Sequence, residues 1–268
     1  MMSCGDYNEV FKSTDYDFRY EAAKEYYASG KYLKCYQLLE DMVLMLKGTD
    51  KGEESLFMLA MCYYNMADYE TSTIYLDKYY KTYPRGEYAE LARFYSGKAS
   101  YEESPDSRLD QTPTYDAIKK LQEFLEYYPY SDLRVQVNDM IFELQNRLVQ
   151  KEYESAQLYY NLGNYTGNCI FGSNNFEACI ITAENALKSY PYTTLREDLY
   201  MLILRSRYRL ANNSIETKSD ERYRQTIDEY YGFTNEFPDS KYAKEAYQIF
   251  QHCSKKVKTT DDDATSEG

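Results

Sequence analysis

The sequence lacks the features by which most enzymes and metalloproteins are recognised. It has no tryptophan and a single histidine, His252, and it contains no glycine-rich phosphate loop, no HExxH motif and no paired CxxC motifs. Cys253 follows His252, but adjacent helical residues point about 100° apart, so the two do not converge as a nucleophile and its base. Carboxylates are numerous, yet no pair of them is marked out by an apolar setting. The sequence therefore predicts no catalytic site, no metal site and no cofactor.

Long apolar runs and an excess of positive charge are also missing. No stretch of about 18 apolar residues occurs, so no segment is expected to span a bilayer. The formal net charge is −13, from 31 Lys and Arg against 44 Asp and Glu. This balance disfavours nucleic acid or an anionic membrane surface as the main partner. The chain is instead rich in aromatic residues, with 34 Tyr and 11 Phe among 268 residues, which is enough for a sizeable core.

Four prolines share a common register: Pro84, Pro129, Pro191 and Pro238. One residue before each stands an aromatic residue: Tyr83, Tyr128, Tyr190 and Phe237. Twelve residues before each stands a small residue: Ser72, Ala117, Cys179 and Thr226. Eight residues before each stands a side chain that is usually larger: Leu76, Leu121, Ala183 and Tyr230. Residues 31–45 fit the same register without the proline, so the pattern occurs five times.

This register has a physical explanation. A small residue and an apolar one four positions later lie on a single helical stripe, where the small side chain allows a neighbouring helix to approach closely. Proline ends the helix, and the Gly, Ser or Thr two residues after it is expected to cap the next one. These are features of the second helix of a tetratricopeptide (TPR) repeat, while Gly97 occupies the tight-packing position of a first helix. A generic helical bundle would not need one register across five copies.

The predicted fold is therefore an all-α TPR α-solenoid of about five helix-turn-helix repeats with a C-terminal capping helix. The repeats are expected at about 17–48, 52–84, 86–129, 131–191 and 193–238, with the cap helix at 241–256, in a single solenoid domain over 17–258. Residues 1–16 are expected to form an N-terminus and tether, and the acidic residues 259–268 a disordered tail. Polar insertions are expected at 104–113, 166–174 and 212–221.

The first five residues, ending in Ser3, Cys4 and Gly5, resemble the end of a bacterial lipoprotein signal. A full signal would also show a charged region and an apolar run upstream, and these are not in the sequence. Two interpretations stay open: Cys4 is the lipidated first residue of the mature protein, or it is an ordinary cysteine.

The other cysteines have two possible roles. Cys35 and Cys179 fill the small-residue position of the repeat and are expected to be packing residues. Cys169 could form a disulfide with Cys179 in an oxidising periplasm, or both could remain free thiols.

Two stretches carry a more specific resemblance. The first is Asp110–Thr114 (DQTPT), followed by Ala117, Leu121, Phe124, Tyr128, Pro129 and Ser131. The second is Gln145–Leu148 (QNRL), followed by Glu152, Glu154, Ala156, Tyr159, Tyr160 and Gly163–Tyr165. Both are similar to the BamD family, in Bacteroidetes-like form: lipoproteins of the outer-membrane β-barrel assembly machinery. The resemblance covers roughly Cys4–Lys258, although the segments 166–174 and 212–221 depart from the family pattern.

The resemblance implies a non-catalytic protein, lipid-anchored through Cys4 at the periplasmic face of the outer membrane. It implies three kinds of partner: a POTRA domain of a BamA-type β-barrel protein, other subunits of the machinery, and unfolded outer-membrane proteins. Contact with the membrane would be through the lipid anchor alone.

A basic cluster stands out in this acidic chain: Arg196, Arg205, Arg207 and Arg209. Alternating arginines spread over more than one helix face, so they cannot all be buried packing partners. They either form a solvated face or present guanidinium groups to carboxylates of an acidic partner, which the resemblance suggests is the BamA-type POTRA domain.

The resemblance also implies recognition of the C-terminal signal of unfolded outer-membrane proteins, which ends in an aromatic residue and a carboxylate. Such a receptor needs an aromatic groove with positive charge nearby. The candidate residues are Tyr26, Tyr27, Tyr63, Tyr64, Arg93 and Lys98. The alternative is that these aromatic rings fill the core between helices.

Two other functions compete with this one. A glycan-binding lipoprotein of the SusD kind would also contain TPR helices, but that family is generally much longer, and sugar platforms favour the tryptophan that is absent here. A generic periplasmic TPR scaffold is the second alternative.

Overall fold

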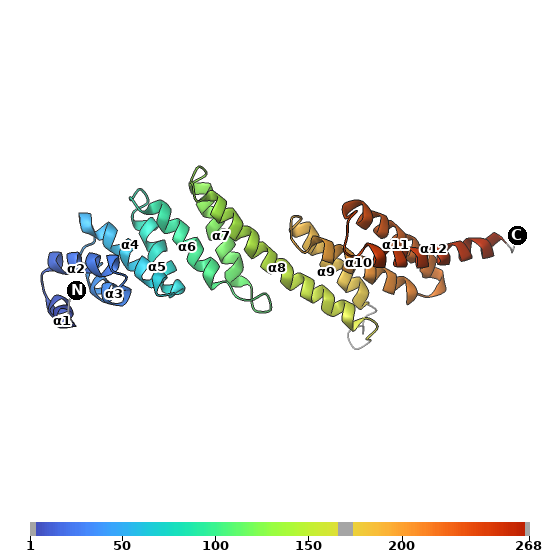
Figure 1. Ribbon diagram of the computed structural model, residues 1–268, viewed down its shortest axis with the longest axis horizontal. Helices are drawn as coiled ribbons and strands as arrows, with labels where there is room; N and C mark the ends of the chain where they lie inside the picture. Colours follow the sequence, from blue (N-terminus) through green and yellow to red (C-terminus); the bar gives the residue numbers. More distant parts are fainter. Residues whose placement is uncertain (1–3, 166–173, 266–268) are drawn as a thin grey trace. The chain divides into compact units, whose positions relative to one another are not determined.

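The computed structural model describes residues 4–165 and 174–265, and the regular elements in these ranges are all α-helices (Figure 1). Their bounds are α1 Cys4–Lys12, α2 Tyr16–Ala28, α3 Tyr32–Met42, α4 Asp50–Asn65, α5 Tyr69–Thr82, α6 Ala89–Glu103, α7 Thr112–Tyr127, α8 Arg134–Leu162, α9 Asn175–Ser189, α10 Arg196–Asn212, α11 Glu216–Glu236 and α12 Ala243–Thr265. The all-α TPR-type fold predicted from the sequence is confirmed.

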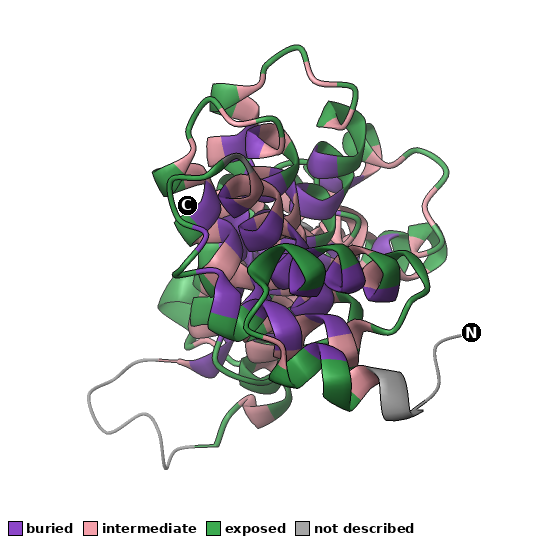
Figure 2. Ribbon diagram, turned by 90° about the vertical axis from the view of Figure 1, so that its left-hand side faces the viewer, coloured by how far each residue is buried: buried purple, intermediate pink, exposed green. Residues whose placement is uncertain are grey.

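The chain divides into two compact units, Met1–Leu144 and Gln145–Gly268, so that the long helix α8 contributes residues to both. Within unit 1, each helix from α1 to α7 packs against the next helix in the chain. Within unit 2, α9, α10, α11 and α12 pack in the same consecutive manner. Each unit has its own buried apolar residues, and Figure 2 shows buried residues alternating with exposed ones along the helices. This consecutive stacking is what a helical repeat protein requires, because one hairpin alone cannot bury its apolar face.

The small-residue position of the repeat lies inside the helix contacts in all five copies. The five side chains there have 0% exposure: Cys35, Ser72, Ala117, Cys179 and Thr226. The apolar position four residues later is equally buried in the first four copies, at Leu39, Leu76, Leu121 and Ala183. In the fifth copy Tyr230 is only partly buried. The register seen in the sequence is therefore the packing register of the fold.

The aromatic residues before the four prolines have one common conformation. They are the C-cap residues of α5, α7, α9 and α11, with φ between −123° and −134° and ψ between 64° and 71°. Each donates its backbone N–H to the carbonyl oxygen four residues earlier. The proline that follows cannot donate, so the helix ends there. The four aromatic residues are thus structurally equivalent, as the repeat interpretation demands.

The polar residues two positions after the prolines organise the next turn. The hydroxyl oxygens of Ser131, Thr193 and Ser240 each accept the backbone N–H two residues further on, at 2.9–3.2 Å. They therefore stabilise the turn that leads into the following helix. Helix α10 begins slightly later, and its N-cap residue Leu195 makes no side-chain cap; the same is true of Tyr88, the N-cap residue of α6.

The N-terminal residues expected to form a tether are instead largely helical. Helix α1 packs against α2, and Val10 is 2% exposed. The hydroxyl of Tyr7 donates to Oε1 of Gln37 at 2.7 Å, and its ring lies 5.8 Å from that of Tyr26. These contacts fix α1 against the first helix pair, because they bury an aliphatic side chain and satisfy a polar one.

Three further expectations are corrected by the helix bounds. Residues 212–221, expected as a polar insertion, lie mostly in the first turns of α11, since a helix with a solvent-facing side can consist of polar residues. Helix α12 continues to Thr265, through most of the expected disordered tail. The loop at 104–113 ends earlier, because Pro113 lies in the first turn of α7, where its missing N–H costs nothing. The insertion at 166–174 falls almost entirely outside the described residues.

No helix in the described part of the chain is both long enough and apolar enough to cross a membrane.

Candidate partner-binding surfaces

A cluster of tyrosines in unit 1 forms the first candidate surface. Tyr27 lies in the last turn of α2 and packs edge-on against Tyr32 at the start of α3, with ring centroids 5.7 Å apart. Tyr64 lies in the last turn of α4 and packs in the same way against Tyr69, at 5.4 Å. Tyr95 of α6 lies 5.0 Å from Tyr64. All five rings are partly exposed, and we call them, together with Lys98, the tyrosine surface.

Lys98 supplies the positive charge of the tyrosine surface. Its Nζ atom lies 5.9 Å from the ring centroids of both Tyr64 and Tyr95. Burial raises the pKa of Tyr27 to about 12 and also raises that of Tyr64, so both phenols are neutral at physiological pH. Partly exposed rings beside a lysine can hold an apolar side chain and an anionic group at once.

Only three of the six sequence candidates for the groove lie on this surface: Tyr27, Tyr64 and Lys98. Tyr26 and Tyr63 are 2% and 8% exposed and belong to the core of unit 1. Within each adjacent pair, Tyr26–Tyr27 and Tyr63–Tyr64, the side chains point in different directions, so only one can face outward.

Arg93 is engaged elsewhere in unit 1. Its guanidinium carbon lies 4.2 Å from the ring centroid of Tyr80 and 3.6 Å from that of Tyr127. Tyr95 was not a sequence candidate. The sequence points to Tyr95 only through its position one helical turn before Lys98, which places both side chains on one face of α6.

The arginines of unit 2 are mostly paired within the chain. Arg196 in α10 donates to Glu236 Oε1 at 2.6 Å. Arg205 makes a bidentate pair with Glu245 of α12, at 2.7 and 2.6 Å. The hydrogen bonds from Arg205 hold the pKa of Glu245 below its ordinary value. Both arginines therefore join α10 to a neighbouring helix, a packing role that the sequence did not reveal.

Arg207 and Arg209 differ from each other. Arg207 bridges two helices, donating to Glu184 of α9 at 2.7 Å and to Glu229 of α11 at 2.8 Å. Arg209 is hydrogen-bonded to Tyr160, which raises its pKa, and no carboxylate pairs with it among the described residues. Of the four arginines, Arg209 is thus the one whose charge is not balanced locally.

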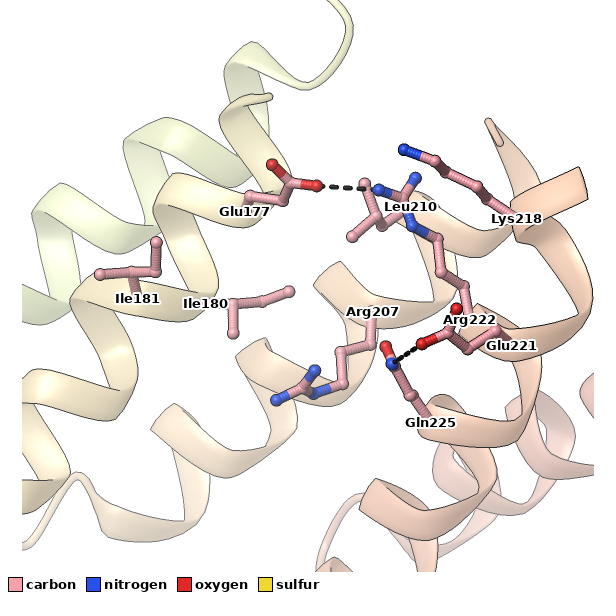
Figure 3. A pocket seen from close by; sticks show the side chains of 9 residues that line it. All are labelled: Glu177, Ile180, Ile181, Arg207, Leu210, Lys218, Glu221, Arg222 and Gln225. Carbon is pink, nitrogen blue, oxygen red and sulfur yellow. Dashed lines mark hydrogen bonds and ion pairs between the residues drawn. The ribbon is translucent and has the colours of Figure 1, made fainter. Parts of the chain in front are cut away.

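A pocket of about 440 Å³ lies between α9, α10 and α11 of unit 2 (Figure 3). The lining includes the apolar side chains Ile180, Ile181 and Leu210 and the guanidinium groups of Arg207 and Arg222. Arg222 donates to Glu177 Oε1 at 2.9 Å, and its other contact is the hydroxyl of Ser214 at 2.6 Å. Both guanidinium groups already hold carboxylates, and the other charged residues of the lining, Lys218 and Glu221, have opposite signs, so this pocket offers a ligand little uncompensated charge.

A second pocket of unit 2, about 460 Å³, is lined by residues of α8, α10 and α12. It contains the unbalanced Arg209 together with Tyr160, Tyr208, Gln248 and His252. We call it the Arg209 pocket.

The adjacent residues His252 and Cys253 do not pair as a base and a nucleophile. Cys253 is fully buried, and burial raises the pKa of its thiol to about 11, so it stays protonated. His252 Nδ1 is hydrogen-bonded to the hydroxyl of Tyr208 at 2.8 Å. In the described ranges, no group of three or more His, Cys, Asp or Glu residues is placed to hold a metal ion.

Cys179 has a free, buried thiol that accepts a hydrogen bond from Ser206 Oγ at 3.1 Å. Its suggested disulfide partner, Cys169, lies outside the described residues. The packing role predicted for Cys35 and Cys179 agrees with their full burial.

Comparison with known proteins gives one family match. A family model described as YfiO, outer membrane lipoprotein, matches residues 15–170. No curated protein matches the chain. Among solved structures, two crystal structures of nearly identical TPR-like repeats from a Podosopora anserina kinesin light chain are similar. One, of a form with a single substitution, is 13% identical, with 83% of this chain and 95% of that chain covered and a TM-score of 0.33. The other is 12% identical, with coverages of 89% and 94% and the same TM-score.

Proposed function

Because the chain belongs to the YfiO family of outer membrane lipoproteins, we propose that it is a non-catalytic component of the machinery that assembles β-barrel proteins in the outer membrane. The family match is the observation that carries this proposal. The stacked helix pairs support it, since such stacks present extended surfaces to other polypeptides. The proposal also agrees with the resemblance of the DQTPT segment to the BamD family. This segment spans the start of α7.

In this proposal Cys4 carries the lipid anchor at the periplasmic face of the outer membrane. Helix α1 begins at Cys4 and packs against α2. A lipid at this position would therefore hold the first helix pair of unit 1 close to the membrane surface.

The proposed partner is a POTRA domain of a BamA-type β-barrel protein, bound by the arginine-bearing part of unit 2. Substituting Arg196, Arg205 or Arg207 would also remove an ion pair that joins helices, so a loss of binding could reflect a loss of folding. Within the described ranges Arg209 makes no such ion pair, so its substitution separates the two effects.

The proposed client site is the tyrosine surface of unit 1. We expect the double substitution Tyr27→Ala with Tyr64→Ala to weaken binding of a synthetic peptide that ends in Phe with a free carboxylate. Two lost aromatic contacts, each about 0.5–1.5 kcal/mol, predict roughly a 5- to 150-fold increase in Kd, measured by fluorescence anisotropy.

The matched control is Tyr130→Ala, because Tyr130 is 96% exposed. If Lys98 contacts the C-terminal carboxylate of the peptide, Lys98→Gln should reduce the preference of the protein for this peptide over the same peptide with an amidated C-terminus. Equal affinity of the double variant and Tyr130→Ala would exclude the tyrosine surface.

Affinity purification tests the function as a whole. The tagged chain, extracted from membranes of its native bacterium, should co-purify with a β-barrel protein that carries POTRA domains. The Cys4→Ala variant should move from the membrane fraction to the soluble fraction. Recovery of other envelope proteins without any such barrel protein would favour a generic periplasmic scaffold instead.

A further inference from the structure

The Arg209 pocket combines polar groups from three helices of unit 2. Helix α10 contributes Arg205, Tyr208 and Arg209, while α12 contributes Gln248 and His252. The pocket is large enough for a side chain of a second polypeptide, at about 460 Å³. Seven of its eight lining residues carry hydrogen-bonding groups, and the eighth, Ile249, belongs to the buried core of unit 2.

The charges of this pocket leave one positive charge in excess. It is lined by two arginines, Arg205 and Arg209, and one carboxylate, Glu245. Both oxygens of Glu245 are held by Arg205, at 2.7 and 2.6 Å, so these two groups neutralise each other. Arg209 remains, exposed and without a carboxylate partner among the described residues. This is unusual in a chain whose net charge is −13.

Several groups beside Arg209 can donate hydrogen bonds. Tyr160 accepts a hydrogen bond from Arg209, so the phenol retains its own O–H for donation. Gln248 is exposed and carries an amide NH₂. The imidazole of His252 is held in place through Nδ1 by Tyr208. A guanidinium with neutral donors around it fits an acceptor-only anion, and its planar N–H fork matches the two oxygens of a carboxylate.

We infer that the Arg209 pocket binds a carboxylate side chain, Asp or Glu, of a partner polypeptide, with Arg209 as its charged donor. A single uncompensated positive charge suits a monoanion better than a doubly charged phosphate. The inference names the residue of unit 2 that would contact the proposed partner. It rests on the proposed function only for the identity of that partner. It also narrows the four-arginine cluster to the one member that has no carboxylate partner among the described residues.

The test uses the full chain and two capped tripeptides, Ac-Gly-Glu-Gly-NH₂ and Ac-Gly-Gln-Gly-NH₂. The side-chain NH₂ signals of Gln248 are followed by NMR during titration. We expect a saturable shift with the glutamate peptide and at least a tenfold weaker response to the glutamine peptide. Arg209→Gln should weaken the response to the glutamate peptide by at least tenfold, whereas Arg224→Gln, at a surface position of α11, should leave it unchanged.

Three results would overturn the inference: equal responses to the two peptides, an undiminished response in Arg209→Gln, or tighter binding of inorganic phosphate than of the glutamate peptide. The peptide titration does not involve the assembly machinery. A positive titration with a failed co-purification would therefore reject the proposed partner while keeping the pocket, and the opposite pair of results would reject the pocket alone.

Discussion

Replacing Arg207 by methionine is expected to destabilise unit 2 by about 2–3 kcal/mol at neutral pH. The guanidinium holds Glu229 and Glu184 from two different helices, and the side chains of Arg207 and Glu229 are only 26% and 18% exposed. Removing one partner of a buried ion pair typically costs about 3–5 kcal/mol, because the remaining charge is left uncompensated. The partial exposure of Glu184, at 47%, reduces that figure. Urea denaturation of the full chain measures the loss.

The pH dependence of this loss separates the electrostatic effect from a packing effect. Burial raises the pKa of Glu229, and the charge of Arg207 offsets that increase only in part. Without Arg207 the pKa rises further, so folded Glu229 binds a proton more readily than unfolded Glu229 does. A group of this kind stabilises the fold at low pH and loses that contribution as pH rises through the folded pKa. The destabilisation by Arg207→Met should therefore be smaller near pH 5 than at pH 7.

Two controls accompany the measurement. Arg224→Met alters an ion pair with Asp220 on the exposed side of α11 and should change stability by less than about 0.5 kcal/mol. Adding Glu229→Gln to Arg207→Met should recover part of the stability at pH 7. An equal loss at both pH values would show that Arg207 acts through packing and not through its charge.

The register of the helical repeat could be predicted from the sequence because it is a local property. A small residue, an apolar residue four positions later and a proline all act within one helix. Cys35 and Thr226 therefore proved as buried as predicted. Helix boundaries were harder to predict in polar segments. Residues 212–221 resemble a loop in composition, yet the turns from Glu216 onward are helical, because they continue a helix whose inner face is fixed by Tyr223 and Thr226.

The roles of the charged residues could not be predicted, since they depend on contacts between repeats. Arg205 meets Glu245 forty residues away along the chain. Insertions of different lengths make such separations irregular, so no fixed spacing identifies the partner. For the same reason Arg209 looked no different from Arg205 in the sequence. The choice between Tyr26 and Tyr27 as the outward-facing ring likewise needed the packing of α2 against its neighbours.

Substituting Gly97 by valine is expected to cost unit 1 about 3 kcal/mol. Gly97 lies in α6, against the neighbouring helix α7, at the tight-packing position noted in the sequence. A Cβ atom there would lie 2.7 Å from Cδ2 and 3.2 Å from Cγ of Leu121. Leu121 has 0% exposure and cannot move aside into solvent. Overpacking of this kind typically costs about 1–3 kcal/mol, and the branched side chain of valine places it at the upper end.

The expected loss corresponds to a decrease in Tm of roughly 6–12 °C, measured by differential scanning calorimetry. Gly232→Ala is the matched control, because Gly232 also lies within a helix, α11, but has nothing within 4 Å of its Cβ position. That substitution should raise stability by roughly 0.5–1 kcal/mol, since alanine favours the helix over glycine. An unchanged Tm in Gly97→Val would show that the glycine is not needed for the close approach of α6 to α7. The packing explanation of the repeat register would then fail at this position.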